Sequence, residues 1–231
     1  MNRKISIFAA FMLTLTIIVA MFTTFDGSTI ALASADDDKI DVKTVYLTFD
    51  DGPSDRVTPK ILDVLKEENV KATFFIIGKQ AENRRYLIER EKAEGHTVAV
   101  HSYTHKYKEI YSSTKSLLKD IDDCNAVTKS ITGEYSKVYR FPGGSFGLSQ
   151  SLISAVSKHG LRYVDWNASI RDAEILNATP KQLYSAAICT SADINNIVLL
   201  AHDSTTKTAT ADALRDIIRY YKNKGYSFSS F

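Results

Sequence analysis

The sequence predicts an α/β fold in which about seven parallel strands form a distorted or incomplete (β/α) barrel. From residue 44 onward, short β-rich segments alternate with helical segments, which is typical of a parallel sheet covered by helices. Polar residues end or follow five of the strand segments, and five strand ends reach one mouth only if the sheet curls round. The expected strands are 44–49, 72–77, 97–100, 137–141, 162–166, 197–201 and 226–230.

The first 33 residues predict an export segment. Arg3 and Lys4 precede an uncharged, mostly apolar stretch from Ile5 to Phe25, and Ala31-Leu32-Ala33 supplies the small residues of a cleavage site. The stretch has 21 residues, which reaches the length of about 20 that spans a bilayer. Cleavage of this signal and its retention as a membrane anchor both remain open. In both cases we expect the rest of the chain to be extracellular or on the cell surface.

Residues 34–42, which include three consecutive aspartates, predict a polar linker, and residues 43–231 predict a single domain. A hydrophobic content of 44% is enough for one substantial core. The net charge is only +2, and the lysines alternate with acidic residues instead of forming a basic stripe. Nucleic-acid binding is therefore not expected. We expect a monomer.

The two cysteines, Cys124 and Cys189, lie far apart in sequence, each in a predicted helix. An exported chain permits a disulfide, but the sequence does not give the Cα separation that a bridge requires. Two small buried thiols are the favoured interpretation. Neither cysteine has a neighbour at zinc-binding spacing, so neither is assigned to a metal site.

Thr44 to Phe49 alternates and is rich in β-branched and aromatic residues, so it predicts the first strand. Asp50 and Asp51 follow it in the turn that runs to Ser54, and two carboxylates therefore project from the carboxyl end of this strand. Alone, the turn is a weak signal, because a helix entry capped by an aspartate has a similar sequence.

The helices between the strands have recognisable ends. Thr58-Pro59 begins the first one, which carries Ile61, Leu62 and Leu65 on one face. Later helices are expected to end at the glycines Gly95, Gly133, Gly160 and Gly225.

His101 and His105 follow the third strand segment, 97–100. A helical start there would put both imidazoles on one face, as i and i+4 neighbours. Together with one carboxylate from the first turn, they would supply three protein ligands for a metal that keeps an open position.

Three further strand segments carry residues suited to a site. Arg140 lies in the fourth, just before the turn Pro142-Gly143-Gly144, which can bring backbone N–H groups close to a substrate. Trp166 ends the fifth segment. His202 follows the nearly all-apolar segment 197–201, an unusual position for a histidine unless it works at the mouth of the sheet.

Taken together, these segments resemble the five motifs of the polysaccharide deacetylases, carbohydrate esterase family 4. The order and the spacing both match, and the resemblance covers about residues 43 to 228. The motifs are Thr48–Gly52, His101–His105, Arg140–Gly144, Trp166–Asp172 and Leu199–Asp203. The resemblance implies a distorted (β/α) barrel, in agreement with the convergence of the strand ends, and a catalytic domain over residues 43–231.

The resemblance also implies a metal site and a catalytic set. A divalent metal, usually zinc, with cobalt or another divalent ion as alternatives, would be held by Asp51, His101 and His105. The general base would be Asp50, and Arg140 would orient it.

The resemblance further implies the acid and the substrate contacts. The general acid would be His202, with Asp172 as its partner. The oxyanion and substrate side would be formed by Gly143, Phe141, Pro142 and Trp166, with Gly143 donating its backbone N–H. Three positions depart from the family pattern: Arg171 stands where a small or apolar residue is common, Ala173 where an aromatic residue is frequent, and Gly143 where many members carry tyrosine.

Export and family together favour a metal-dependent hydrolase that removes N-acetyl groups from N-acetylglucosamine in the glycan strands of peptidoglycan. N-acetylmuramic acid, chitin oligomers and acetyl-xylan are alternative substrates, because substrate choice depends on residues outside the motifs. A carboxylate with two histidines also suits a non-haem Fe(II) oxygenase, and a non-catalytic wall-binding module is a further alternative. Asp50 and His202 argue against both, since a hydrolase needs a base and an acid.

Overall fold

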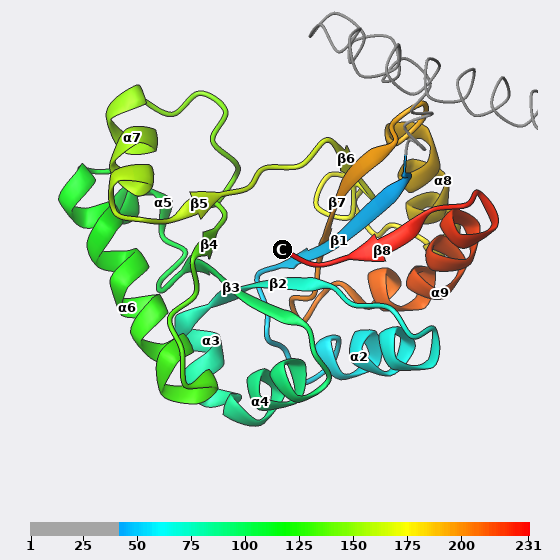
Figure 1. Ribbon diagram of the computed structural model, residues 1–231, viewed down its shortest axis with the longest axis horizontal. Coiled ribbons are helices and arrows are strands. Elements are labelled where there is room, and N and C mark those ends of the chain that lie inside the picture. The colour runs from blue at the N-terminus through cyan, green and yellow to red at the C-terminus, as the bar shows by residue number, and fades with distance from the viewer. Residues whose placement is uncertain (1–41) are drawn as a thin grey trace, which may run out of the picture. The chain divides into compact units, whose positions relative to one another are not determined.

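The computed structural model of the protein describes residues 42–231, so the predicted export segment and all but the last residue of the linker lie outside the described residues. Within the described part the chain forms one sheet of eight strands surrounded by helices (Figure 1). The strands are β1 Thr44–Asp50, β2 Thr73–Ile77, β3 Thr97–Ser102, β4 Val138–Tyr139, β5 Arg162–Tyr163, β6 Ala168–Ser169, β7 Asn196–His202 and β8 Ser227–Ser229.

The sheet is entirely parallel, in the order β5-β4-β3-β2-β1-β7-β6, and β8 pairs with the first half of β1. Among the described strands, β5 and β6 end this path and do not pair with each other, so the curled sheet stays open. An incomplete (β/α) barrel of parallel strands is therefore confirmed. Parallel strands place all their carboxyl ends at one edge, which is where the site residues gather.

The helices lie around the outside of the sheet (Figure 1). They are α2 Thr58–Glu67, α3 Gly78–Asn83, α4 Arg85–Ala93, α5 Tyr107–Ile110, α6 Thr114–Thr132, α7 Gln150–Lys158, α8 Pro180–Thr190 and α9 Thr208–Asn223. The predicted start of α2 is confirmed, and its residues Ile61, Leu62 and Leu65 are buried. Helix α6 ends at Gly133, whose φ of 86° is left-handed, as a helix-ending glycine requires. No helix within residues 42–231 is long and apolar enough to cross a membrane.

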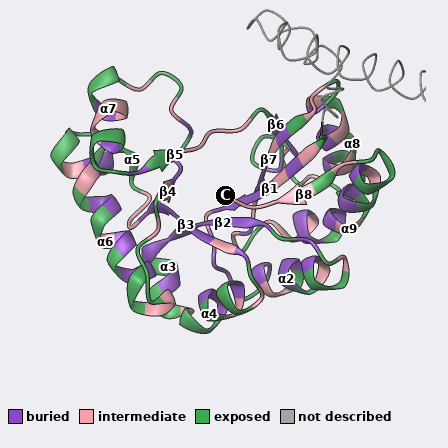
Figure 2. Ribbon diagram, in the orientation of Figure 1, coloured by how far each residue is buried: buried purple, intermediate pink, exposed green. Residues whose placement is uncertain are grey.

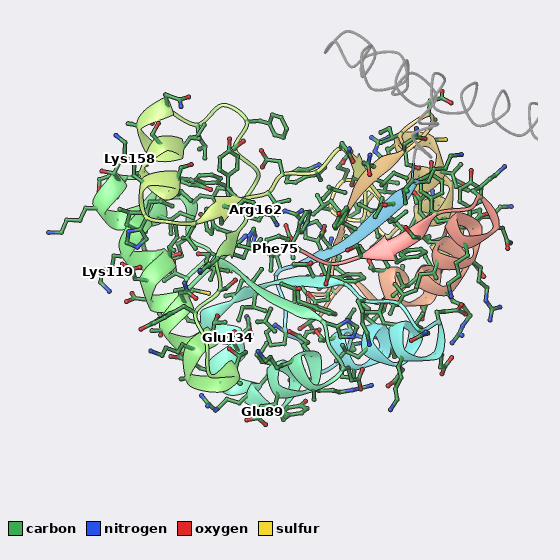
Figure 3. The ribbon with its side chains drawn as sticks, viewed as in Figure 1. Phe75, Glu89, Lys119, Glu134, Lys158 and Arg162 are labelled. Carbon is green, nitrogen blue, oxygen red and sulfur yellow. The ribbon has the colours of Figure 1, made fainter. Side chains whose placement is uncertain are left out.

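The core lies between the sheet and the helices. Buried residues follow the strands and the inner faces of the helices (Figure 2), and Phe49 of β1 stacks on Phe74 of β2 with ring centroids 5.2 Å apart. Charged side chains such as Lys119 and Lys158 lie on the outer helices, whereas Phe75 lies among the strands (Figure 3). The core fixes strand register and thereby the positions of the strand ends.

The predicted fifth strand, 162–166, is wrong in its second half. Only Arg162–Tyr163 form β5, and a separate strand, β6, follows at 168–169. The carbonyl oxygens of Val164 and Asp165 accept hydrogen bonds from the Arg140 guanidinium, at 2.9 and 3.2 Å. These carbonyls accept hydrogen bonds from the buried Arg140 guanidinium and not from a neighbouring strand, so the β-ladder ends there.

Both cysteines are free. Cys124 on α6 is buried, as expected, but Cys189 on α8 is exposed, so the prediction of two buried thiols is wrong for Cys189. It is the penultimate residue of α8, where the helix face has already turned outward from Ala186 and Ala187.

Candidate active site

Asp50, the last residue of β1, pairs in parallel register with His202, the last residue of β7. The next residue, Asp51, has a left-handed φ of 75°. Gly52 then lies against Asp203, where an added Cβ would be 2.1 Å from the carboxylate Oδ2. Only glycine fits so close, and it allows the two carboxylates of the turn to lie beside the end of β7.

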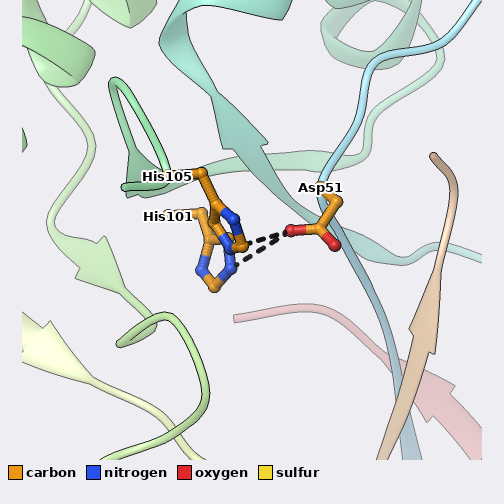
Figure 4. Close-up of side chains that lie close together, drawn as sticks. All are labelled: Asp51, His101 and His105. Carbon is orange, nitrogen blue, oxygen red and sulfur yellow. Dashed lines mark ion pairs between the residues drawn. The ribbon is translucent and has the colours of Figure 1, made fainter. Parts of the chain in front are cut away.

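Asp51, His101 and His105 form a candidate metal triad (Figure 4). Asp51 Oδ1 lies 3.5 Å from His101 Nε2 and 3.2 Å from His105 Nε2, and one ligand atom from each residue falls within 4.8 Å of the others. Asp51 Oδ1 is buried without a hydrogen-bond partner among the described residues. A buried acceptor without a hydrogen bond that faces two imidazoles is suited to bind a cation, and this mixed oxygen and nitrogen donor set fits zinc or a similar divalent ion.

The electrostatics of the triad favour a charged carboxylate. Burial alone would raise the pKa of Asp51, but the nearby His101 and His105 lower it well below its usual range. Burial and the neighbouring His101 lower the pKa of His105, which favours the neutral imidazole that a metal ligand must present. His101 Nδ1 lies 2.8 Å from the carbonyl oxygen of Arg140, so Nδ1 donates, and in the neutral ring Nε2 carries the lone pair on the side of Asp51.

A tight loop brings the two histidines together, and the expected helical start is wrong. His101 lies in β3, and His105 has a φ of 56° in the loop before α5. The carboxylate of Asp120 on α6 accepts four hydrogen bonds of 2.5 to 3.0 Å from this loop, given by Ser102 Oγ, Tyr103 N, Thr104 N and Thr104 Oγ1. The left-handed φ of His105 lies outside the right-handed helical region, so the loop does not begin a helix.

Asp50 is held by Arg140. Both side chains are buried, and Arg140 Nη1 donates to Asp50 Oδ1 at 2.9 Å and to Thr48 Oγ1 at 2.7 Å. The guanidinium carbon lies 4.2 Å from the ring centroid of Phe75. A buried carboxylate beside a fixed cation has one oxygen occupied and the other free for chemistry.

His202 is paired with Asp172 at the opposite side of the mouth. Asp172 accepts from His202 Nδ1 at 2.8 Å, from the His202 backbone N–H at 2.9 Å and from Thr210 Oγ1 at 2.7 Å. Burial disfavours the charged ring, but the bond to Asp172 and the nearby carboxylates raise the pKa of His202 to about 9. The ring is therefore held as an imidazolium with Nε2–H available as a proton donor.

The turn after β4 has two left-handed glycines, Gly143 and Gly144, with φ of 78° and 83°. Ser145 anchors it, because its backbone N–H donates to Asp165 Oδ1 at 3.0 Å and its hydroxyl donates to Asp165 Oδ2. Gly143 is exposed and Trp166 is partly exposed, so both can reach a substrate. Phe141 has no exposed surface and Pro142 is buried. Both side chains lie in the core beneath the turn, and the assignment of these two residues to the substrate and oxyanion side stays a prediction.

Sequence reasoning missed several residues of this region. Asp120 positions the triad, Asp165 positions the turn, and Thr48 positions Arg140. Nothing local in the sequence links these residues to their partners. The charged residue Asp120 lies on the buried face of α6 next to Leu117 and Ile121, and this was the one signal available. Tyr107 and Phe146 also lie at this mouth.

The open parallel α/β barrel carries three groups at one mouth: a candidate metal triad, a buried carboxylate–arginine pair and a histidine–carboxylate pair. This combination is typical of a metal-dependent hydrolase. The chain belongs to the polysaccharide deacetylase family, because the sequence model of that family matches residues 37–164. The resemblance inferred from the five motifs is thus confirmed, and a deacetylase activity follows from this membership.

Known relatives are similar over most of the described chain. The peptidoglycan-N-acetylmuramic acid deacetylase of Bacillus subtilis (strain 168) is 34% identical over 190 residues, which cover 81% of this chain and 70% of that protein. The catalytic domain of the peptidoglycan N-acetylglucosamine deacetylase from Eubacterium rectale has a TM-score of 0.76 at 37% identity, covering 82% of this chain and 88% of that one.

A family 4 acetyl xylan esterase from Clostridium thermocellum, solved in complex with a cobalt ion, has a TM-score of 0.72 at 32% identity and covers 81% of this chain and 88% of that one. The chain spans between 66% and 70% of the length of four curated relatives that it matches. The three proteins described by name differ in the acetylated sugar that their names state: N-acetylmuramic acid, N-acetylglucosamine and acetyl xylan.

Proposed function

We propose that the protein is a metal-dependent N-deacetylase of cell-wall glycan, acting on N-acetylglucosamine units of peptidoglycan. The observation that carries the proposal is the meeting of three groups at one mouth: the Asp51–His101–His105 triad, the Asp50–Arg140 pair and the His202–Asp172 pair. Amide hydrolysis needs an activated water, a proton acceptor, an oxyanion donor and a proton donor for the leaving nitrogen. The site has a candidate for each.

Asp51, His101 and His105 would hold the divalent ion, zinc or cobalt. When bound, such an ion supplies a Lewis acid for the acetyl carbonyl and lowers the pKa of water. Asp50 would accept the proton of the attacking water, while the bond from Arg140 fixes its carboxylate. The backbone N–H of Gly143 would donate to the oxyanion that develops on the carbonyl.

Breaking the C–N bond is the harder half, because an amine anion is a very poor leaving group. His202 Nε2–H would protonate the nitrogen as the bond breaks, and Asp172 stabilises the imidazolium that gives the proton. The products are free amine and acetate. The non-haem oxygenase alternative uses neither this acid nor the buried Asp50–Arg140 pair.

The location of the protein is part of the proposal. The apolar segment within residues 1–33 supports export, with the domain secreted or held at the membrane surface, where peptidoglycan lies. Fractionation of the producing cells and N-terminal sequencing of the recovered protein test both possibilities. A full-length protein found in the cytoplasm would contradict export.

Acetate release tests the activity. The metal-loaded protein is incubated with peptidoglycan, chitin oligomers or acetyl-xylan, and released acetate and deacetylated sugars are measured. We expect acetate from peptidoglycan, with new glucosamine residues in the glycan. Mapping of deacetylation to muramic acid would move the substrate to N-acetylmuramic acid. No acetate from any of the three, with zinc or cobalt supplied, would overturn the deacetylase proposal.

Two substitutions separate metal binding from proton transfer. Asp50→Asn should keep the bound metal but lower kcat at least about a hundredfold, the scale of a lost general base. His101→Ala should lose the metal and the activity together. His159→Ala is the control, because that histidine pairs with Asp122 on the outer surface. An Asp50→Asn protein with native activity would remove Asp50 from its role.

A further inference from the structure

Two of the large apolar side chains exposed within residues 42–231 lie at the mouth of the site. Tyr107 has 47% of its surface exposed and Phe146 has 70%. Phe146 belongs to the loop after β4, and Tyr107 opens α5, directly after the loop that carries His105. Exposed apolar side chains grouped beside a functional site mark a candidate ligand-binding surface.

The rings flank the glycine turn from both sides. A Cβ placed on Gly143 would lie 3.1 Å from Cε1 and 3.2 Å from the hydroxyl of Tyr107. A Cβ placed on Gly144 would lie 3.0 Å from Trp166 and 3.1 Å from Phe146. Because these two positions have no side chains, Tyr107, Phe146 and Trp166 can pack directly against the backbone of the turn. We call these three side chains the aromatic strip.

One end of the aromatic strip touches the metal triad. The rings of Tyr107 and His105 meet edge to face, with centroids 5.3 Å apart. At the other end, Phe146 meets Trp166 edge to face at 6.1 Å, and Trp166 lies 5.7 Å from the Arg140 guanidinium carbon. The strip thus leads from the position of the reacting acetyl group to Phe146, along the turn that carries the Gly143 N–H.

The loop that carries Phe146 is anchored although the ring is exposed. Ser145, its neighbour, is bound by its backbone N–H and its hydroxyl to Asp165, and Leu148 N donates to the Ser145 carbonyl at 3.2 Å. Phe146 itself is absent from the hydrophobic core cluster, so its ring contributes little to folding. A rigidly placed, solvent-facing ring loses little conformational entropy when a ligand covers it.

We propose that Phe146, backed by Trp166, is a stacking platform for a second pyranose ring, the glycan unit next to the one that loses its acetyl group. The faces of a pyranose ring carry C–H groups and are apolar, so they pack on an aromatic ring and bury its exposed surface. The ligand class is a β-linked chain of hexopyranoses. The inference rests on the proposed function, which supplies the position of the first sugar.

The test compares chain lengths and uses binding as an independent measurement. Acetate release is measured for the native protein, Phe146→Ala and Phe146→Trp with N-acetylglucosamine oligomers of one to five units and with vinyl acetate, an ester without a sugar. Tyr135→Ala is the control, because Tyr135 is also exposed, at 57%, but precedes β4 at the opposite end of the strands. Binding of the tetramer to Asp50→Asn, with and without Phe146→Ala, is measured by titration calorimetry.

For Phe146→Ala we expect the ratio of kcat/KM on the tetramer to kcat/KM on vinyl acetate to fall about tenfold, mainly through KM. Tetramer binding to the Asp50→Asn background should weaken by a similar factor, and Phe146→Trp should restore at least half of the loss. Equal losses on the tetramer and vinyl acetate, or no weakening of tetramer binding, would overturn the platform. If the native protein released no acetate at all, the proposed function would fail, and the calorimetric comparison would still decide whether Phe146 binds sugar.

Discussion

Asp50 and Asp51 are neighbours in sequence but differ in their surroundings. Asp50 continues the strand and is buried against Arg140, whereas Asp51 turns out of the strand with a φ of 75° and faces two imidazoles. The cation beside Asp50 leaves that carboxylate suited to proton transfer, and the unpartnered oxygen of Asp51 suits it to metal binding. One backbone angle thus separates the two proposed roles.

The proton donor can be tested through the leaving group. His202→Ala should lower kcat on an N-acetylated sugar about a hundredfold or more, because the amine must be protonated as it departs. An activated acetyl ester leaves without a proton, so its hydrolysis should fall much less. Steady-state kinetics on both substrates check this. Equal losses on the amide and the ester would contradict the role of His202 as general acid.

At the scale of elements, the site depends on loops that are fixed from other parts of the chain. Asp120 of α6 satisfies four donors of the loop between His101 and His105, and Asp165 fixes the turn after β4. Each loop has internal hydrogen bonds, such as His105 N to Ser102 Oγ and Gly144 N to the Phe141 carbonyl, but the two carboxylates come from other segments of the chain. The helices and strands around them therefore set the geometry of the metal triad.

Asp120→Ala should weaken metal binding. The substitution removes all four acceptor contacts of the loop that carries His105, and outer positioning groups of this kind typically change metal affinity about 10- to 100-fold. Zinc affinity is measured by competition with a chromophoric chelator. Asp122→Ala is the matched control, because its side chain on the same helix is 58% exposed and pairs with His159. Native zinc affinity in Asp120→Ala would refute this coupling.

The elements that the sequence predicted correctly have a strong periodic signal. The strands near 44–49, 72–77, 97–100 and 197–201 were found because each is rich in apolar and β-branched residues, most of which are buried. The strands β5 and β6 have only two residues each, which is too few for a periodic pattern. Hydrogen bonds from Arg140 to the backbone after β5 interrupt the single strand that was expected there. The loop after β3 was misassigned because the acid that shapes it lies about fifteen residues further along the chain.

How well a site residue could be predicted also depends on its position relative to the strands. Residues at strand ends could be predicted, since parallel topology alone brings Asp50, His101 and His202 to one edge. Phe141 was assigned to the substrate side from its motif, but it packs edge to face on Tyr139 and Tyr163 in the core. Whether a strand residue points to the mouth or to the core depends on register, which adjacent sequence does not specify.

At the scale of the whole molecule, one buried acid works against stability. Glu91 on α4 has no exposed surface, and neither of its carboxylate oxygens has a hydrogen-bond partner among the described residues. Burial raises the pKa of Glu91 well above its usual value, and the nearby Asp203 raises it further. The folded protein therefore keeps Glu91 neutral at a pH at which the unfolded chain ionises it.

This linkage makes stability depend on pH. Above the ordinary pKa of 4.5, the unfolded chain releases a proton that the folded chain retains, so the Glu91 contribution falls as pH rises, by at most about 1.4 kcal/mol per unit. Glu91→Gln removes the effect, and its advantage over the native protein in free energy of unfolding should grow between pH 5 and 8.

Urea denaturation at several pH values measures that difference. Glu89→Gln is the control, because Glu89 lies on the same helix but on its exposed outer side (Figure 3). Parallel pH curves for the native protein and Glu91→Gln would show that Glu91 is not held neutral.

The open sheet also bears on self-association. A barrel that does not close has free strand edges, and a long free edge is a template for pairing with other chains. Here the two strands that end the path, β5 and β6, are only two residues long each. The backbone beyond β5 is bound by Arg140, and Ser169 N in β6 donates to Thr190 Oγ1 at 3.0 Å. Within residues 42–231, the strands that end the path are therefore too short to give neighbouring copies a long edge for pairing.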